Sequence, residues 1–221
     1  MATSGSRDFN IDVGEIIEEA YERCGLEVRT GYDARTARRS LNLMFADWAN
    51  RGINMWTVAQ GTITLTQGQA TQTLTADVVD VLEIVLRRSN TDFEVERISR
   101  GEYATLPNKT TQGRPSQFWF NRQIDPVINL WAVPENSTDQ LIYYYVQRIE
   151  DADALVNTTD MPFRFYPCMV AGLAYYIAMK RAPERIQLLK SVYEEEFQRA
   201  SDEDEDRVPL KLQPSMQYLR V

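Results

Sequence analysis

The chain has 221 residues, of which 43% are hydrophobic and 10% aromatic, so it can bury a substantial core without disulfide or metal support. It contains no histidine, which excludes Ser-His-Asp and Cys-His catalytic arrangements and most imidazole-based zinc sites. The formal net charge of −8 argues against tight binding to nucleic-acid phosphates or to an anionic membrane surface, because such binding depends on Lys and Arg.

The N-terminal part has the pattern of two amphipathic helices. Asp12 and Glu15 have the spacing of a capping box, and apolar residues then recur with helical periodicity until Gly25. A second helix is predicted from about residue 33 to residue 50. Because only a short, glycine-containing turn separates the two helices, the sequence predicts a helical hairpin within residues 1–58.

From about residue 55 the apolar period changes from 3.6 to 2, as expected for strands. Residues 62–65 and 71–75 flank a polar, glycine-containing segment and predict a hairpin. Residues 127–133 are apolar on both pleat faces, which favours a central strand. Further strand-like segments are residues 78–86, 93–98, 117–121 and 141–147, and residues 99–106 suit a helical turn. The prediction for residues 59–150 is a central antiparallel β-sandwich or small barrel of about six or seven strands.

Helical periodicity returns after a linker at residues 150–160. Pro162 suits the first turn of a helix that extends to about residue 181, and apolar residues around most of its circumference predict burial on two sides. A second helix is predicted to about residue 200. Residues 161–206 are therefore expected to complete a bundle with the N-terminal hairpin, in a chain of the α+β class.

The segment of residues 207–221 has an unusual composition. Two prolines exclude a helix, yet the segment is too apolar for a solvated tail. Either it folds back on its own domain or it is an extended arm that another chain receives, since an added strand gains backbone hydrogen bonds and side-chain pockets. Its apolar residues are Val208, Leu210, Leu212, Met216, Tyr218, Leu219 and Val221.

No motif of an enzyme or of a cofactor site is present. The sequence has no glycine-rich phosphate-binding loop, and its acidic pairs lie in a linker and in a charge run. We therefore expect no catalytic residues, no cofactor and no metal. Charged residues of the second helix are candidates for contacts between subunits, in preference to a phosphate site. They are Arg35, Arg38, Arg39 and Asp47.

An alternative function rests on the aromatic strand around Trp119, which has arginines nearby and resembles a base-stacking platform on a β-barrel. On this alternative the β-domain is a binding module for an oligosaccharide or single-stranded nucleic acid. Strand alternation sends Phe118 and Phe120 to one face and Trp119 to the other, however, which favours core aromatics.

The cysteines and the apolar stretches bear on the cellular location. Cys24 and Cys168 are far apart in sequence, without metal-ligand spacing, and are interpreted as buried free thiols of a reducing compartment. The first ten residues are polar where a secretory signal is apolar, and residues 166–179 are fewer than the about 20 that a membrane span needs. We expect a protein without contact to membranes that is made in the cytoplasm.

A resemblance to a known family is carried by two segments, AYERCGL (residues 20–26) and TGYDARTARRSLNLMFADWANRGINMWTV (residues 30–58). They are similar to the opening of the head-to-tail adaptor proteins of short-tailed bacteriophages, also called tail accessory, head-completion or tail tubular proteins. The order of helical hairpin, β region, closing helices and extended C-terminus is similar too, so the resemblance covers about residues 11–221. The patterned residues that carry it are Arg38, Leu41, Asn42, Trp48, Gly52 and Trp56.

The resemblance implies a structural virion protein of the neck or tail, made in the cytoplasm of a bacterial host. It implies a homo-oligomeric, dodecameric ring beneath the portal, with DNA passing through the channel at ejection without sequence-specific binding. The apolar arm would dock onto the portal protein, and the far face would receive the tail nozzle or hub. An acidic chain suits such a channel, because negative charge repels phosphates and lets DNA slide.

Overall fold

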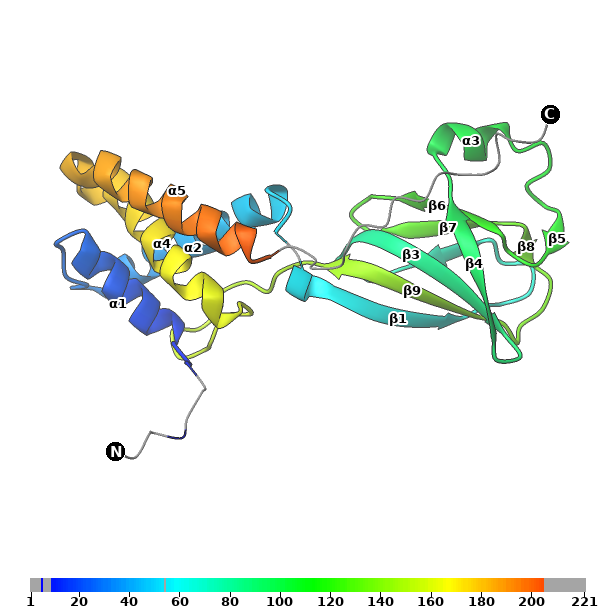
Figure 1. Cartoon of the computed structure of the whole chain (residues 1–221), viewed down its shortest axis with the longest axis horizontal. Coiled ribbons are helices and arrows are strands. Elements are labelled where there is room, and N and C mark those ends of the chain that lie inside the picture. Colours follow the sequence, from blue (N-terminus) through cyan, green and yellow to red (C-terminus); the bar gives the residue numbers. More distant parts are fainter. Residues whose placement is uncertain (1–4, 6–8, 54, 205–221) are drawn as a thin grey trace.

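The computed structural model describes residues 5, 9–53 and 55–204, which form two lobes at the ends of an elongated molecule (Figure 1). The helices are α1 (Val13–Arg23), α2 (Gly31–Asn50), α3 (Arg100–Thr105), α4 (Tyr166–Arg181) and α5 (Ile186–Asp202), with 3-10 turns at Met55–Thr57, Phe163–Phe165 and Pro183–Arg185. The strands are β1 (Val58–Thr64), β2 (Thr71–Thr73), β3 (Val78–Arg88), β4 (Thr91–Arg97), β5 (Gln112–Gly113), β6 (Gln117–Asn121), β7 (Val127–Trp131), β8 (Val133–Pro134) and β9 (Gln140–Gln147). We call α1, α2, α4 and α5 the helical lobe, and residues 58–147 the sheet lobe.

Capping boxes set the starts of the first two helices. The Asp12 side chain accepts a hydrogen bond from the Glu15 amide, and the Glu15 carboxylate accepts one from the Asp12 amide, as predicted. Thr30 and Asp33 form the same reciprocal arrangement before α2. This second box lies in the polar turn of the hairpin, and it starts α2 at Gly31, two residues earlier than predicted.

The helical lobe is built around α4, which packs against α1, α2 and α5. Buried residues lie around most of its circumference, which agrees with its all-round apolar sequence. Gly172 lies where α4 packs against Met44 of α2 and Tyr193 of α5. A Cβ atom there would lie 2.8 Å from Cε2 of Tyr193 and still closer to Sδ of Met44, so only glycine fits without displacement of a neighbour.

The sheet lobe is one seven-stranded sheet in the order β1-β9-β3-β4-β6-β7-β2, with β5 and β8 as a separate short pair. Neighbours in the large sheet are antiparallel except for the short contact between β4 and β6. The sheet curls into a half-barrel around its own hydrophobic core (Figure 1). The α+β class is confirmed, and the β region is closer to the predicted small barrel than to a sandwich of two sheets.

Two details of the strand prediction were wrong. The segments that were predicted to form a hairpin do not pair with each other, because β1 pairs with β9 and β2 pairs with β7. They are the two edges of the sheet, and the polar turn between them connects one edge to the other. The predicted central strand, β7, lies second from an edge, and its burial alternates, so one of its faces is only half-buried.

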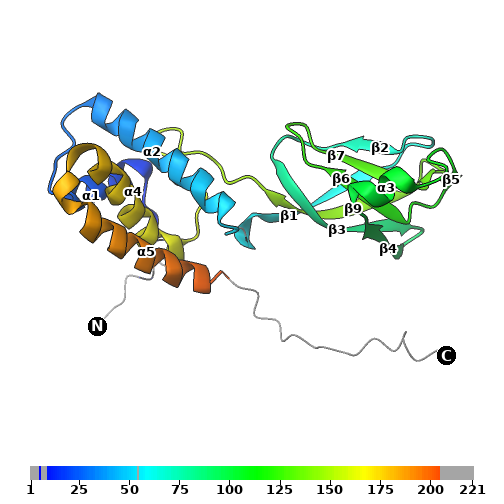
Figure 2. The ribbon, with the colours of Figure 1, turned by 90° about the horizontal axis from the view of Figure 1, so that it is seen from above.

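The lobes have separate hydrophobic cores. One cluster of buried side chains extends from Val13 to Ala200 and contains only residues of the helices and the segments beside them, whereas the other lies within residues 65–143. Two connections join the lobes, one between α2 and β1 and the other at residues 148–160 (Figure 2). The helical lobe is therefore assembled from both ends of the described chain, with the sheet lobe inserted between them. The predicted domain limits at residues 58 and 150 stay predictions.

Candidate interaction surfaces

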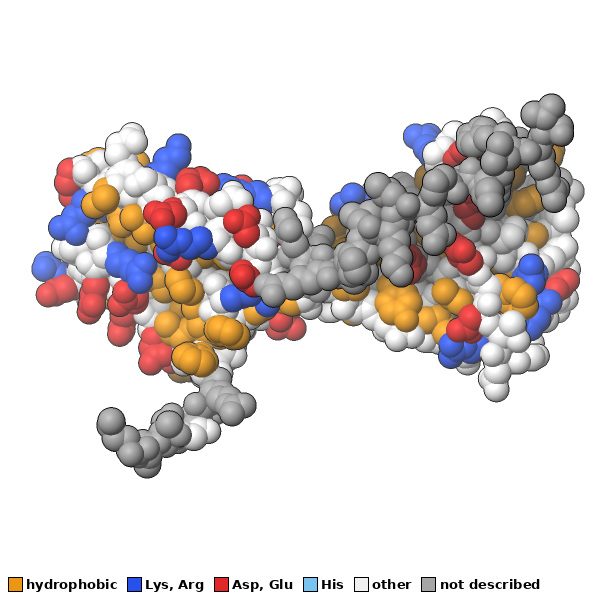
Figure 3. Space-filling model, viewed as in Figure 1, with side chains coloured by type: hydrophobic (Ala, Val, Ile, Leu, Met, Phe, Trp, Pro, Cys, Tyr) orange, Lys and Arg blue, Asp and Glu red, His pale blue; other side chains and the backbone are white. Residues whose placement is uncertain are grey.

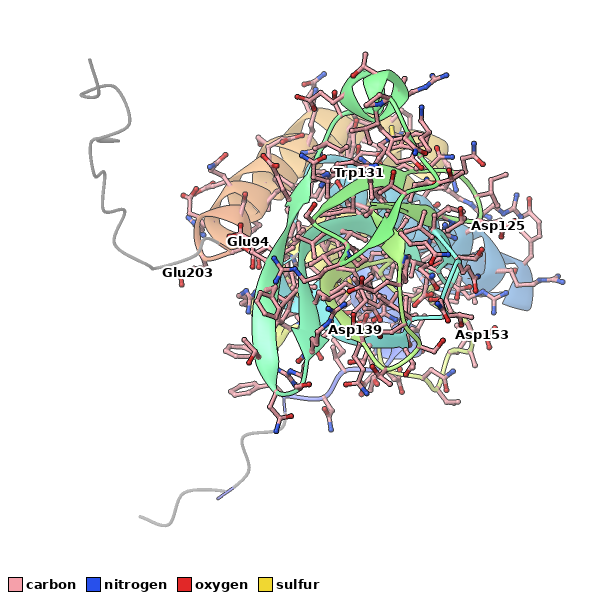
Figure 4. The ribbon with its side chains drawn as sticks, turned by 90° about the vertical axis from the view of Figure 1, so that its right-hand side faces the viewer. Glu94, Asp125, Trp131, Asp139, Asp153 and Glu203 are labelled. Carbon is pink, nitrogen blue, oxygen red and sulfur yellow. The ribbon has the colours of Figure 1, made fainter. Side chains whose placement is uncertain are left out.

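The longer connection between the lobes is fixed to α2 by side chains. The amide nitrogen of the Asn42 side chain donates to the Ala152 carbonyl at 3.3 Å, and its oxygen accepts from the Ala152 amide at 2.8 Å. One turn earlier, the Arg38 guanidinium donates to the Asp153 carbonyl. Viewed along the molecule, Asp153 and Glu203, the residue after α5, lie on opposite sides, so this linker runs along the side away from the end of α5 (Figure 4).

The linker is also fixed to α1 and to the short turn after α2. The amide of Gly14 donates to the Leu155 carbonyl at 2.8 Å, and the Trp56 indole donates to the Asp160 carbonyl at 3.0 Å. Three residues that carry the family resemblance, Arg38, Asn42 and Trp56, thus hold the connection between the lobes. The other three shape the helical lobe itself: Leu41 and Trp48 are fully buried, and Gly52 has a φ of +82° just after α2.

Removing the Asn42 side chain should loosen this linker. In an Asn42→Ala variant, the amide and the carbonyl of Ala152 each lose their hydrogen-bond partner. Because Ala152 is only 3% exposed, water cannot replace these partners, and we expect about 1–3 kcal/mol of destabilisation. Hydrogen exchange at the Ala152 amide should accelerate, and thermal unfolding measures the stability. Asn50→Ala, on the exposed last turn of α2, is the matched control. Unchanged exchange at Ala152 would show that the linker is held by its other contacts.

Two of the predicted subunit-contact residues lie free on the outer face of α2. Arg35 is exposed, its Nε donates to the Gly31 carbonyl of the same helix at 3.2 Å, and it forms no ion pair with any residue that the structure describes. Arg39, one turn later, is exposed and makes no ion pair within the described residues. Both line a hollow of about 390 Å³, whose other lining residues are Arg38, Asn42 and Leu43.

Further cations make this side of the helical lobe positive. Burial, together with the nearby Arg39 and Arg181, lowers the pKa of Lys180. Arg181 is neutralised by Asp33, at 2.5 Å, and hydrogen bonding from Thr30 and this arginine lower the pKa of the Asp33 carboxyl. Because Arg181 is paired, the positive excess comes from the arginines of α2 and from Lys180, which forms no ion pair within the described residues.

The other two predicted contact residues are engaged within the chain. Arg38 holds the linker, as described, and Asp47 pairs with Arg51 at 2.9 Å. Arg51 in turn lies over the ring of Phe197, with 4.4 Å between the guanidinium carbon and the ring centroid. Sequence reasoning missed the linker role of Arg38 because the residue that it contacts is far away in the chain. The assignment of these residues to subunit contacts stays a prediction, as does that of the arm, which lies outside the described residues.

The strand around Trp119 does not present the exposed aromatic platform that the alternative function requires. Phe118, at 1% exposed, and Phe120 lie in the core of the sheet lobe, as strand alternation predicted. Trp119 lies on the other face, half-buried against Tyr103 of α3, with 5.4 Å between ring centroids. Arg114 lies over the ring of Phe93. The observation that suggested ligand stacking is therefore explained by packing.

The described chain offers no arrangement for metal binding or for membrane insertion. Residues 9–53 and 55–204 contain no group of three or more His, Cys, Asp or Glu that could hold a metal ion. No helix in these ranges has the length and apolar character needed to cross a membrane. Both cysteines are free and buried, as predicted, and burial raises the pKa of Cys168 to about 12, which makes its thiolate scarce at neutral pH.

Comparison with known proteins identifies the family. No curated protein matches the chain. A model of the SU10 adaptor protein family matches residues 11–214, a range that includes both lobes, their connections and half of the predicted arm. This match confirms the resemblance to phage adaptor proteins, which are structural and not catalytic. The chain therefore belongs to the SU10 adaptor protein family.

Proposed function

We propose that this protein forms the ring that joins the portal to the tail of a short-tailed phage and lines the channel for DNA. The observation that carries the proposal is the family match over residues 11–214, which gives the chain a structural adaptor role in a phage. Ring formation, portal binding and contact with a tail nozzle or hub are the finer parts of the proposal. Its place would be the neck of the virion.

The two-lobed shape supports a connecting role. A connector has to present one surface to each of two neighbours, and here two separately packed lobes lie at opposite ends of the elongated molecule (Figure 2). The hydrogen bonds of the linker fix it to α2 and to the turn before β1, which shortens the free connection between the lobes. The net charge of −8 supports passage of DNA without capture.

The arm provides the test of portal binding. Deletion of residues 207–221 should abolish binding to the portal ring of the same phage, because the apolar side chains that would enter portal pockets are removed. The melting behaviour of both lobes should stay nearly unchanged, since the core clusters of the described residues are formed within residues 13–200. Mass photometry of the protein alone and after mixing with the portal ring measures binding as a saturable, ring-sized step.

Two controls keep the result interpretable. A variant of full length in which the seven apolar residues of the arm are replaced by serine separates loss of apolar contacts from loss of length. Circular dichroism melting reports whether the lobes still fold. If the deletion variant still bound the portal ring, only the proposed role of the arm would be overturned. If the unmodified full-length protein did not bind the portal ring, the proposed function would be overturned.

A further inference from the structure

Two pairs of like charges on the helical lobe form no ion pair within the part of the chain that the structure describes. Arg35 and Arg39 lie four residues apart on α2, both exposed, and neither forms an ion pair within the described residues. Glu18 and Glu22 have the same spacing on α1, are also exposed, and likewise lack a cationic partner in that part of the chain. Like charges at this spacing destabilise a helix, so each pair is unfavourable in the isolated chain.

Three acidic residues on these helices are neutralised within the chain. Glu19 pairs with Arg23 at 2.9 Å on α1, and Asp47 pairs with Arg51 at the same distance on α2. Asp33, at the start of α2, pairs with Arg181 of α4. Since ion pairs within the chain neutralise these acidic residues, the two unpaired sets of like charges are candidates for contacts with another molecule.

The two pairs lie on different sides of the helical lobe. α1 lies along its lower side in Figure 1, where acidic side chains gather in Figure 3, and α2 lies at the back, as the view from above in Figure 2 shows. We call the exposed face around Arg35 and Arg39 the positive surface, and the one around Glu18 and Glu22 the negative surface. Because they lie on different sides, each can contact another molecule at the same time.

Exposed apolar side chains mark the positive surface as a contact surface. Tyr32 and Leu43 are 60% and 59% exposed, and they follow the same face of α2 as Arg35 and Arg39, at helical spacings of three and four residues. Tyrosine and arginine are enriched in protein interfaces, whereas a purely solvated helix face is polar. The combination of exposed tyrosine, leucine and arginine is therefore more typical of a protein-binding surface than of a surface exposed to solvent.

We propose that the partner is a second copy of this chain, with Arg35 and Arg39 of one copy facing Glu18 and Glu22 of the next. The inference rests on the proposed ring. Both pairs have the same spacing, with about 6 Å between neighbouring Cβ atoms, so two ion pairs can form together. The contact joins two different surfaces, and such a head-to-tail contact closes into a ring when the rotation between copies allows it. A two-fold contact of α2 with α2 would place arginine against arginine.

Charge reversal tests this contact. One variant carries Arg35→Glu and Arg39→Glu, and the other carries Glu18→Lys and Glu22→Lys. Each alone should fail to assemble on the portal ring, because like charges then meet at every contact. An equimolar mixture should assemble to the mass of the unmodified protein, because every contact between the two variants again joins opposite charges. Mass photometry with the portal ring measures the assembled mass, and assembly should weaken with rising salt.

A control variant with the same change of net charge as the arginine reversal carries Arg100→Glu and Lys190→Glu, on exposed positions of α3 and α5. It should assemble normally, and circular dichroism melting should show that all variants fold. Unimpaired assembly of either reversed variant, or failure of the mixture, would overturn this contact while the ring itself stands. Failure of the unmodified protein to assemble would instead overturn the proposed function. Loss of DNA binding by the arginine reversal, with assembly intact, would assign the positive surface to nucleic acid.

Discussion

Trp48→Ala should destabilise the helical lobe by about 3–5 kcal/mol, the range for removal of a large aromatic side chain from a core. Trp48 is fully buried, and its indole nitrogen donates to the Tyr193 hydroxyl at 2.8 Å. Its ring lies 5.7 Å from that of Phe165 and 6.0 Å from that of Phe197, measured between centroids. The residue thus joins α2 to α5 and to the turn before α4, and its removal leaves both a cavity and a buried hydroxyl without its donor.

The distribution of the effect is as informative as its size. Because the two hydrophobic cores have no described residue in common, amide protection in hydrogen-exchange mass spectrometry should fall in α1, α4 and α5 and stay unchanged in β3 and β9. Trp48→Phe is the matched control: it keeps an aromatic ring in place and should cost less. Equal loss of protection in both lobes would show one cooperative unit, and the predicted domain limits at residues 58 and 150 would then be wrong.

Features that depend on neighbouring residues were predictable from the sequence. The capping box at Asp12, the end of the first helix at Gly25 and the burial of Phe118 and Phe120 each follow from short spacings and local backbone rules. Gly25 has a φ of +68°, which glycine adopts at low cost, so its position marks the end of a helix. Such features depend on few residues and are little affected by the rest of the fold.

Features that depend on residues far apart were not predictable. β1 pairs with β9, so Val58 lies opposite Val146, and no property of either segment alone selects that partner over a nearer one. The nearer segment, residues 71–75, was chosen because a turn lies between the two, yet a turn also suits a connection between opposite edges of a curled sheet.

The arginines of α2 likewise combine a property that was predictable from local sequence with one that was not. Exposure of Arg35 and Arg39 follows from the helical periodicity of α2, and the sequence places both on the polar flank. Arg38 lies on the same flank, but its guanidinium is used by the Asp153 carbonyl, more than a hundred residues away. Tertiary contacts decide whether a surface arginine is free to bind a partner. The sequence could therefore predict a group of candidate arginines, but not which of them stay unpaired.

Phe118→Ala should destabilise the sheet lobe by about 3–5 kcal/mol and leave the helical lobe intact. Phe118 is almost fully buried on β6, in the cluster that also contains Ile84 and Leu141 from β3 and β9. Removing its ring opens a cavity in the core of the sheet lobe, and the packed neighbours close such a cavity only in part. Loss of amide protection should therefore be confined to β3, β6, β7 and β9, as measured by hydrogen-exchange mass spectrometry.

Trp119→Ala is the companion variant that separates packing from ligand binding. Trp119 is half-buried against Tyr103, so its removal gives up one aromatic contact of about 0.5–1.5 kcal/mol beyond the lost area and should cost clearly less than Phe118→Ala. An aromatic binding platform would reverse this order, because ligand-stacking side chains contribute to affinity and little to stability. If Phe118→Ala left the melting temperature unchanged while binding to an oligosaccharide or single strand disappeared, the sheet lobe would be a binding module, and its aromatic strand would have to open toward solvent.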